Sequence, residues 1–489
     1  MIMKRFFLLL SALFVSVAVF SSCSGEMEDS YVVLASSAVK QDAEWLKVAE
    51  ALTAKHSADL VFYDKAPREA LAELQKLTPR YVAIVEKPEN LDKDFVIDMH
   101  HVSREVDEDI YADFLWGMIT GYDAAAAMKM LDNSTEPLLV KDAVATIMEL
   151  NSAKWFDNYA WVDDHKRGLW GQKRGRTSAV ETDSMDTKVT LKKFTDLYEA
   201  YDPDLIVTAA HATQRNLEMP FSLGNLRPKD GKLYADDHFA KTKWDLKESG
   251  KRRVYFAVGN CLIGDVNNTK ESMAIAWMNG SNAATMIGYV VTTWHGRNGW
   301  GGLKYWVTSP DRYTLAEAIY MNQQDFLHQQ NEWFPSLIKE NYPAFGRDEF
   351  RLARKRMREV MGEDFTMEHI GFWHDRDVLA YYGDPKWEVR LQAVEAEKDY
   401  TITSEIKGGK CIVTVKTSEN FNLERMKGDK FKQEHVLDLP FNYFFPKRLK
   451  NPRLADGQEW KAVVDENFLL VYNADFEPNK TYEIIIDLN

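Results

Sequence analysis

The sequence predicts an α/β protein with two parallel-sheet regions and a C-terminal β-sandwich. Residues 31–150, and again residues 151–387, alternate short apolar runs with longer amphipathic stretches, which is typical of βαβ units in a parallel sheet. From residue 388 onward the apolar residues recur at every second position and turn signals appear, as in antiparallel strands. A chain of 489 residues is long enough for several such units, each with its own core.

The first residues predict export. Lys4 and Arg5 precede a largely apolar run, Phe6–Phe20, that is too short to span a bilayer, and small residues lead to Cys23. This pattern indicates a secretory signal peptide over residues 1–22. It also resembles a bacterial lipoprotein signal, which implies that Cys23 becomes the lipid-modified first residue. The alternative is ordinary cleavage after Ser22.

An acidic tether over residues 23–30 follows the signal. It resembles segments that direct lipoproteins to the outer membrane, which implies a location at the cell surface or on the periplasmic face. The predicted membrane contact is therefore the lipid anchor at Cys23.

The first α/β region, residues 31–150, is predicted to contain alternating strands and helices. Its strands are Tyr31–Leu34, Leu60–Tyr63 and Tyr81–Val85, and its helices are Gln41–Lys55, Arg68–Leu77, Asp123–Leu131 and Asp142–Leu150. The second region, residues 151–387, has apolar runs at Tyr159–Val162, Leu205–Ala210, Val254–Val258 and Ala284–Thr293, and residues 314–362 are rich in helix formers.

The C-terminal region, residues 388–489, begins with a predicted hairpin. Tyr400–Ile406 and Lys410–Val415 flank the pair Gly408-Gly409, a strong turn signal between two alternating strands. Alternation places Cys411 on the same face as Val413 and Val415, so we expect this cysteine to be a buried apolar residue rather than a reactive one.

Composition excludes several function classes. Lys and Arg number 61 against 75 Asp and Glu, and the formal net charge is -14, with no basic stripe of the kind that binds nucleic acid. No phosphate-binding loop is present, and the glycines of Gly296–Gly302 lack the context of a dinucleotide fingerprint. We therefore predict no cofactor and no nucleic-acid partner.

Two strands of the second region lead directly to reactive side chains. Leu205–Ala210 is followed directly by His211, and the run Val254–Val258 is followed by Gly259, Asn260 and then Cys261. Open α/β sheets place their sites at the carboxyl ends of parallel strands, so neighbouring strands would bring the two side chains to one edge. An imidazole can raise the thiolate fraction of a cysteine and protonate a leaving amine. The alternative is a buried free cysteine at a strand end.

Four segments resemble gingipain-type cysteine peptidases, which are relatives of the caspases. Cys261 lies in a segment like the nucleophile region of that family, and His211 ends a segment like its histidine strand. The matching segments, in chain order, are Ile110–Gly117, Leu205–His211, Val254–Gly264 and Leu379–Pro385.

The resemblance implies a caspase-like catalytic region over residues 151–387 and an immunoglobulin-like β-sandwich over residues 388–489. It implies an endopeptidase of protein or peptide substrates that cleaves after basic residues. Cys261 would be the nucleophile and His211 the acid/base, with the backbone N–H groups of Cys261 and Ala212 forming the oxyanion hole. The family has glycine where this chain has Ala212, and a smaller residue where it has Asn260. The alternative is therefore an inactive surface lipoprotein that acts as a binding or scaffold module.

Other polar and aromatic residues are candidates for the substrate pocket. Trp294 and Trp300 are candidates for its wall, and Asp163 and Asp164 follow a predicted strand. His295 is a competing histidine, but it follows the cysteine in the chain, so we favour His211. A further alternative is a metal hydrolase. Its ligands would be drawn from Asp163, Asp164, His165, His211 and His295.

Overall fold

The structure is a computed structural model that describes residues 25–27, 29–147, 150, 156–163, 166–221, 224–266, 269–346, 348–392, 398–429, 431 and 435–488. The predicted signal peptide, the lipidation site Cys23, and the candidates Asp164 and His165 lie outside these residues. Within them, no helix is long and apolar enough to cross a membrane.

A single large sheet forms the centre of the molecule. Over the described residues it has 12 strands, most of them parallel. In spatial order they are β10 (Glu181–Ser184), β9 (Leu169–Arg174), β8 (Asn158–Val162), β7 (Asp142–Ala145), β11 (Leu205–Thr208), β17 (Arg253–Ala257), β18 (Ala283–Tyr289), β19 (Leu379–Tyr382), β5 (Leu115–Ile119), β4 (Tyr81–Val85), β2 (Tyr31–Ser36) and β3 (Asp59–Tyr63).

The two α/β regions expected from the sequence share this sheet. Strand β19 joins them, since it pairs antiparallel with β18 and parallel with β5. Strand β7 precedes residue 150 in the chain but pairs with β8 and β11, the strands of the second region. The strands therefore form one continuous α/β sheet rather than two separate ones.

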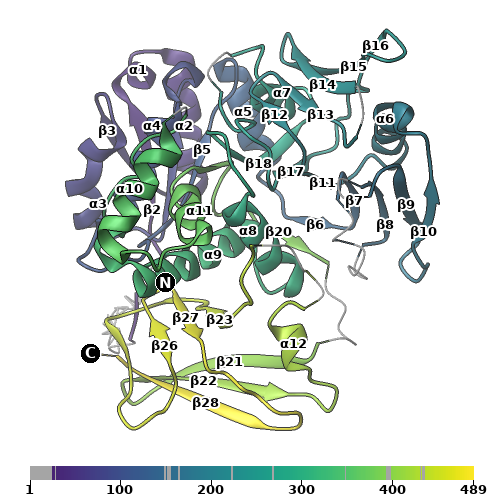
Figure 1. Cartoon of the computed structure of the whole chain (residues 1–489). Helices are drawn as coiled ribbons and strands as arrows, with labels where there is room; N and C mark the ends of the chain where they lie inside the picture. The colour runs from purple at the N-terminus through teal and green to yellow at the C-terminus, as the bar shows by residue number, and fades with distance from the viewer. Residues whose placement is uncertain are drawn as a thin grey trace, which may run out of the picture.

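Helices pack against the sheet, and α8, α9 and α11 contact one another in front of it (Figure 1). The helix bounds are α1 (Ser37–Lys40), α2 (Ala43–His56), α3 (Leu71–Leu77), α4 (Lys93–Val102), α5 (Ala124–Asn133), α6 (Thr190–Tyr201), α7 (Met273–Asn279), α8 (Arg297–Thr308), α9 (Leu315–Trp333), α10 (Glu349–Met361), α11 (Met367–Asp375) and α12 (Leu423–Met426).

The helix predicted over Asp142–Leu150 is wrong, because residues 142–145 form strand β7. Ala143, Val144 and Ala145 are fully buried between two parallel neighbours. A short apolar run that is buried on both faces has no alternation, so its pattern does not distinguish a strand from a helix.

An antiparallel sheet is inserted between β11 and β17 and begins directly after His211. Its strands, which also form its spatial order, are β12 (Ala212–Thr213), β13 (Asn216–Glu218), β14 (Gly224–Lys229), β15 (Lys232–Asp237) and β16 (Thr242–Asp245).

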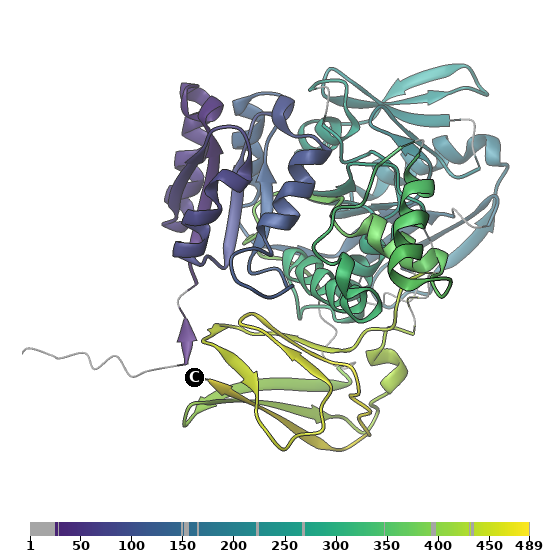
Figure 2. The ribbon, with the colours of Figure 1, turned by 60° about the vertical axis from the view of Figure 1, so that its left-hand side comes forward.

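Two small antiparallel sheets at the C-terminus lie below the α/β part in both views (Figures 1 and 2). They share one apolar core that includes Val413, Phe441, Leu469 and Ile484. One sheet has the order β21 (Tyr400–Lys407), β22 (Lys410–Thr417), β28 (Thr481–Leu488) and β25 (Pro452–Leu454), and the other has β23 (Phe441–Phe444), β27 (Phe468–Val471) and β26 (Ala462–Val464).

The predicted hairpin is confirmed. Strands β21 and β22 pair in register from Tyr400 with Thr417 to Lys407 with Lys410. Gly408 and Gly409 between them both have positive φ, 60° and 73°, as a two-residue hairpin turn requires. Cys411 is buried on the inner face of β22, as the alternation predicts.

Candidate active site

The ends of two neighbouring strands form the candidate site. β11 and β17 pair in parallel, with Thr208 opposite Ala257. His211 is three residues after Thr208, the last residue of β11, and Cys261 is four residues after Ala257, the last residue of β17. The two reactive residues therefore leave the sheet at the same edge, which is where open α/β sheets place their sites.

A buried asparagine joins the two strand ends. Asn260 has no exposed surface. Its Oδ1 accepts a hydrogen bond of 2.8 Å from the Thr208 hydroxyl, and its Nδ2 donates one of 2.8 Å to the Ala210 carbonyl. The Asn260 side chain thus couples the residue before Cys261 to the residue before His211, a task that a smaller side chain could not perform.

The turn after Cys261 is held in an unusual conformation. Leu262 has a φ of 57°, a region that costs a non-glycine residue about 1–2 kcal/mol. Its N–H donates to the Val291 carbonyl at 2.9 Å, and the N–H of Gly264 donates to Tyr289 at 2.9 Å. A Cβ on Gly264 would come within 2.4 Å of the Gly288 carbonyl oxygen, so only glycine fits. Strain of this kind persists where the surrounding structure determines it, often at functional sites.

Cys261 itself is partly buried and free of disulfides. Its Sγ donates a hydrogen bond of 3.3 Å to the carbonyl oxygen of Thr293. Burial raises the pKa of the thiol, and the negative charges of Asp375 and Glu349 act in the same direction. Backbone hydrogen bonds at Thr293 and at Cys261 oppose this rise without cancelling it. The thiol therefore rests in its protonated form, in an acidic rather than a basic environment.

His211 lies at the surface. Its carbonyl accepts a hydrogen bond of 2.9 Å from the N–H of Glu218 in the inserted sheet, and its side chain is exposed. Over the described residues, no hydrogen bond joins its imidazole to Cys261. The strand ends bring the two residues to one edge, but the resting structure does not bring their reactive atoms into contact.

The backbone at Ala212 is not strained, because its φ is not positive. It begins strand β12, pairs with Leu217, and is absent from the described residues with positive φ. The backbone at this position therefore suits an L-residue.

The loop after β18 approaches Cys261 from the other side. Trp294 is half-buried, donates from Nε1 to Glu349 at 3.3 Å, and stacks on His374 at 5.0 Å between ring centroids. His295 is exposed, with its ring 4.1 Å from that of His435. Trp300 is buried in α8, and its Nε1 would lie 3.4 Å from a Cβ at Gly259. Of these three side chains, the Trp300 indole is thus the one that lies beside Gly259, two residues before Cys261.

Asp163 is buried at the end of β8, two strands away from β11 because β7 lies between them. It is at the same edge of the sheet as His211. In the described residues, no group of three or more His, Cys, Asp or Glu side chains has the geometry to hold a metal ion.

Asp384, in the segment Leu379–Pro385, forms a buried cluster of polar contacts. Asp384 is fully buried, and its Oδ2 lies 2.8 Å from Lys55 Nζ and 2.7 Å from His56 Nε2, both near the end of α2. Its Oδ1 accepts a hydrogen bond from the Tyr31 hydroxyl at 2.9 Å. Asp384 therefore ties the end of β19 to the first α/β region.

Sequence reasoning missed Asp375, a buried carboxylate at the end of α11 that contacts the loop after β18. The available signal was the charged run His374–Asp377 between the apolar segments Phe372-Trp373 and Val378-Leu379. Charged residues in such a position are buried with partners, but the sequence does not say which partners.

Comparisons with known proteins concern the overall fold. No family model and no curated protein matches the chain. Among solved structures, it is similar to the Arg specific cysteine proteinase gingipain R (RgpB), with a TM-score of 0.39 and 11% identity over 81% of this chain and 86% of that one. It is also similar to the complex of Porphyromonas gingivalis RgpB pro- and mature domains, with a TM-score of 0.40 and 10% identity over 94% and 93%.

Proposed function

We propose that the chain is a cysteine endopeptidase in which Cys261 is the nucleophile and His211 the acid/base. The observation that carries this proposal is the parallel pairing of β11 and β17, which ends both strands at one sheet edge with these two residues. The hydrogen bonds of Asn260 and the positive φ of Leu262 support it, since both hold the turn around Cys261 in a defined conformation.

The chemistry follows from the two residue types. The Cys261 thiol gives its proton to the His211 imidazole, and the sulfur attacks the substrate carbonyl to form a tetrahedral intermediate. His211 then protonates the leaving amine, the acyl-enzyme forms, and water releases the second product with the proton returning to the enzyme. The backbone N–H groups of Cys261 and Ala212 stabilise the oxyanion.

The resting geometry sets a condition on this mechanism. The thiol donates to Thr293 and its pKa is raised by burial, while the imidazole of His211 is exposed. Substrate binding must therefore bring the imidazole to the sulfur. Catalytic hydrogen bonds commonly tighten only when substrate is present.

We further propose that the substrate is a protein or peptide with a basic residue before the scissile bond. The sequence resemblance implies this preference, and the negative charges of Asp375 and Glu349 near Cys261 favour a cationic group.

We also propose that the protein is exported and is anchored to the outer membrane through a lipid at Cys23. Metabolic labelling with a radioactive fatty acid, in the natural chain and in Cys23→Ala, tests the anchor.

The second candidate is a non-catalytic binding or scaffold module. The specific observation that favours it is the resting arrangement itself. The Cys261 thiol donates to the Thr293 carbonyl, and the charges of two carboxylates raise its pKa.

One experiment separates the two candidates. A peptidyl chloromethyl ketone ending in arginine and the small reagent iodoacetamide are compared for their rates of alkylation of Cys261, followed by mass spectrometry of the peptide. The buried Cys411 serves as an internal reference. His211→Ala is compared with His295→Ala, which also removes an exposed histidine near the sheet edge.

An endopeptidase will react with the peptidyl reagent much faster than with iodoacetamide, and His211→Ala will slow the peptidyl reaction about 100-fold or more because the acid/base is lost. His295→Ala will have little effect. Equal, slow reaction of both reagents that is indifferent to His211→Ala refutes the peptidase proposal and leaves the binding module.

A further inference from the structure

The buried carboxylate of Asp375 accepts hydrogen bonds from the segment that also accepts the hydrogen bond of the Cys261 thiol. Asp375 is 1% exposed. Its Oδ1 accepts a hydrogen bond of 3.0 Å from the Thr293 hydroxyl, and its Oδ2 accepts one of 2.6 Å from the backbone N–H of Arg297 and one of 3.3 Å from the Tyr289 hydroxyl. These three partners span residues 289–297, from the last residue of β18 through the connecting loop to the first residue of α8.

Thr293 transmits this arrangement to the cysteine. Its hydroxyl donates to Asp375 and accepts from the N–H of Gly296 at 3.0 Å. These two hydrogen bonds fix the Thr293 side chain between α11 and the next turn of its own loop. Its carbonyl oxygen is the acceptor of the Cys261 thiol. A displacement of Asp375 would therefore move the atom against which the thiol is oriented.

The polar groups around Asp375 differ from those around an ordinary buried carboxylate. Within the described part of the chain, no lysine or arginine side chain forms an ion pair with it. The guanidinium of Arg297 pairs with Glu368 at 3.1 Å instead, and only its backbone reaches Asp375. The ring atom Nδ1 of His374 lies 3.0 Å from Oδ1, and Glu349 lies beyond that histidine, 3.9 Å from Nε2.

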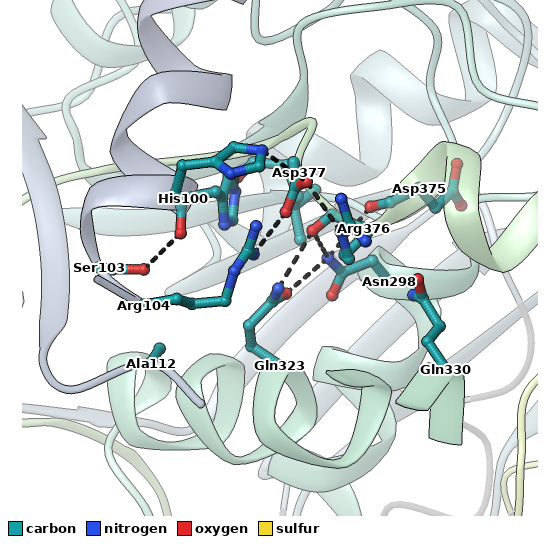
Figure 3. A network of polar contacts seen from close by, with 12 residues as sticks. His100, Ser103, Arg104, Ala112, Asn298, Gln323, Gln330, Asp375, Arg376 and Asp377 are labelled. Carbon is teal, nitrogen blue, oxygen red and sulfur yellow. Dashed lines mark hydrogen bonds and ion pairs between the residues drawn. The ribbon is translucent and has the colours of Figure 1, made fainter. Parts of the chain in front are cut away.

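The neighbouring carboxylate shows the contrast. Asp377 is also buried, but Arg104 donates to it at 2.6 Å and Arg376 at 2.8 Å (Figure 3). Burial would raise the pKa of Asp377, but Arg104 and Arg376 lower it well below its ordinary value. The charge of Asp377 is thus compensated by two arginines in a buried ion-pair cluster. The charge of Asp375 instead raises the pKa of the Cys261 thiol.

We propose that Asp375 is a positioning residue for Cys261, which acts through Thr293 to hold the resting thiol oriented toward the loop of residues 289–297. The inference rests on the proposed function, because the orientation matters for catalysis only if Cys261 is the nucleophile. In that case Asp375 keeps the cysteine unreactive toward small reagents and places its loop for a bound substrate.

The test measures the two alkylation rates in Asp375→Asn, which keeps the shape and removes the charge. Iodoacetamide alkylation of Cys261 between pH 5 and 9 will show a lower midpoint and a several-fold higher rate at pH 7, because the variant lacks one of the negative charges that raise the pKa of the thiol. Alkylation by the peptidyl chloromethyl ketone will become at least tenfold slower, since the loop is no longer fixed. Unfolding would also expose the thiol to iodoacetamide and abolish peptidyl binding, so the buried Cys411 must stay as slow to alkylate in the variant as in the natural protein.

Two further variants control the result. Asp325→Asn removes another buried carboxylate, which accepts hydrogen bonds from Tyr305 and Tyr472. Among the described residues it has no hydrogen bond to residues 289–297, and the variant will leave both rates unchanged. Thr293→Ser keeps the hydroxyl and will behave as the natural protein, whereas Thr293→Val will slow the peptidyl reaction.

An unchanged iodoacetamide profile in a folded Asp375→Asn protein, with the fold checked by circular dichroism and thermal unfolding, overturns the proposal. So does a change of both rates in the same direction. If the natural protein does not react with the peptidyl reagent at all, the proposed peptidase function fails, and the iodoacetamide profile still decides whether Asp375 controls the thiol.

Discussion

The side-chain Nδ2 of Asn260 donates a hydrogen bond of 2.8 Å to the carbonyl oxygen of Ala210. This contact joins the residue before the candidate nucleophile to the residue before the candidate acid/base. It explains why a residue larger than the gingipain pattern suggests is present at position 260. The distance between the two strand ends is fixed by a buried side chain rather than by the sheet alone.

Asn260→Ala is expected to destabilise the protein by about 2–4 kcal/mol, because it leaves the partly buried Ala210 carbonyl without its donor and removes a partner of the buried Thr208 hydroxyl. Urea denaturation measures the change. Asn216→Ala, which removes only a surface hydrogen bond with Thr213, should stay within about 0.5 kcal/mol. Equal effects of the two substitutions would contradict the role given to Asn260.

Gly296→Ala is expected to cost about 3 kcal/mol or more, through both backbone strain and a steric clash. Gly296 has a φ of 68°, and a Cβ there would lie 2.3 Å from the carbonyl oxygen of Val258. Gly408→Ala is the matched control, since Gly408 has a φ of 60° with nothing within 4 Å of its Cβ position, and it should cost about 1–2 kcal/mol. Thermal unfolding of the two variants separates clash from strain.

Asp384→Asn is expected to cost about 3–5 kcal/mol, because it leaves Lys55 and His56 without their buried partner. Tyr31→Phe, which removes a single hydrogen bond to the same carboxylate, should cost about 1 kcal/mol. Although burial opposes it, the pairing with His56 and Lys55 lowers the pKa of Asp384. This stabilisation is therefore present above the ordinary pKa of an aspartate and is lost as the pH falls below it, and Asp384→Asn should flatten the acid limb of a pH–stability curve.

Asp113 should produce the opposite pH dependence. Burial, with the added charges of Asp107 and Asp465, raises its pKa to about 9. Between the ordinary aspartate pKa and about pH 9 the folded protein holds a proton that the unfolded chain has lost, so stability falls by about 1.4 kcal/mol per pH unit over this window. Urea denaturation at pH 5, 6, 7 and 8 should show this decline in the natural protein and a shallower one in Asp113→Asn. Parallel curves for the two proteins would show that Asp113 is ionised in the folded state.

Local structure was predictable where the alternation of apolar residues and the residues of the turn indicate the same element. The adjacent glycines Gly408 and Gly409 required a two-residue turn, and the alternation around Cys411 required one buried face, so the hairpin was confirmed residue by residue. Strand β7 was not predictable, because Ala143–Ala145 is buried on both faces and has no period.

The sequence by itself determined that His211 and Cys261 each follow an apolar strand, and hence that both lie at the carboxyl-end edge of an α/β sheet. Only the tertiary structure decided that these strands are direct neighbours, that β19 joins the two groups of strands, and that Asp375 lies beside the loop that holds the cysteine. The physical reason is the range of the interactions. Turns and strand faces depend on residues within a few positions, whereas strand order and the partners of a buried charge depend on packing between segments that are tens to hundreds of residues apart in the chain.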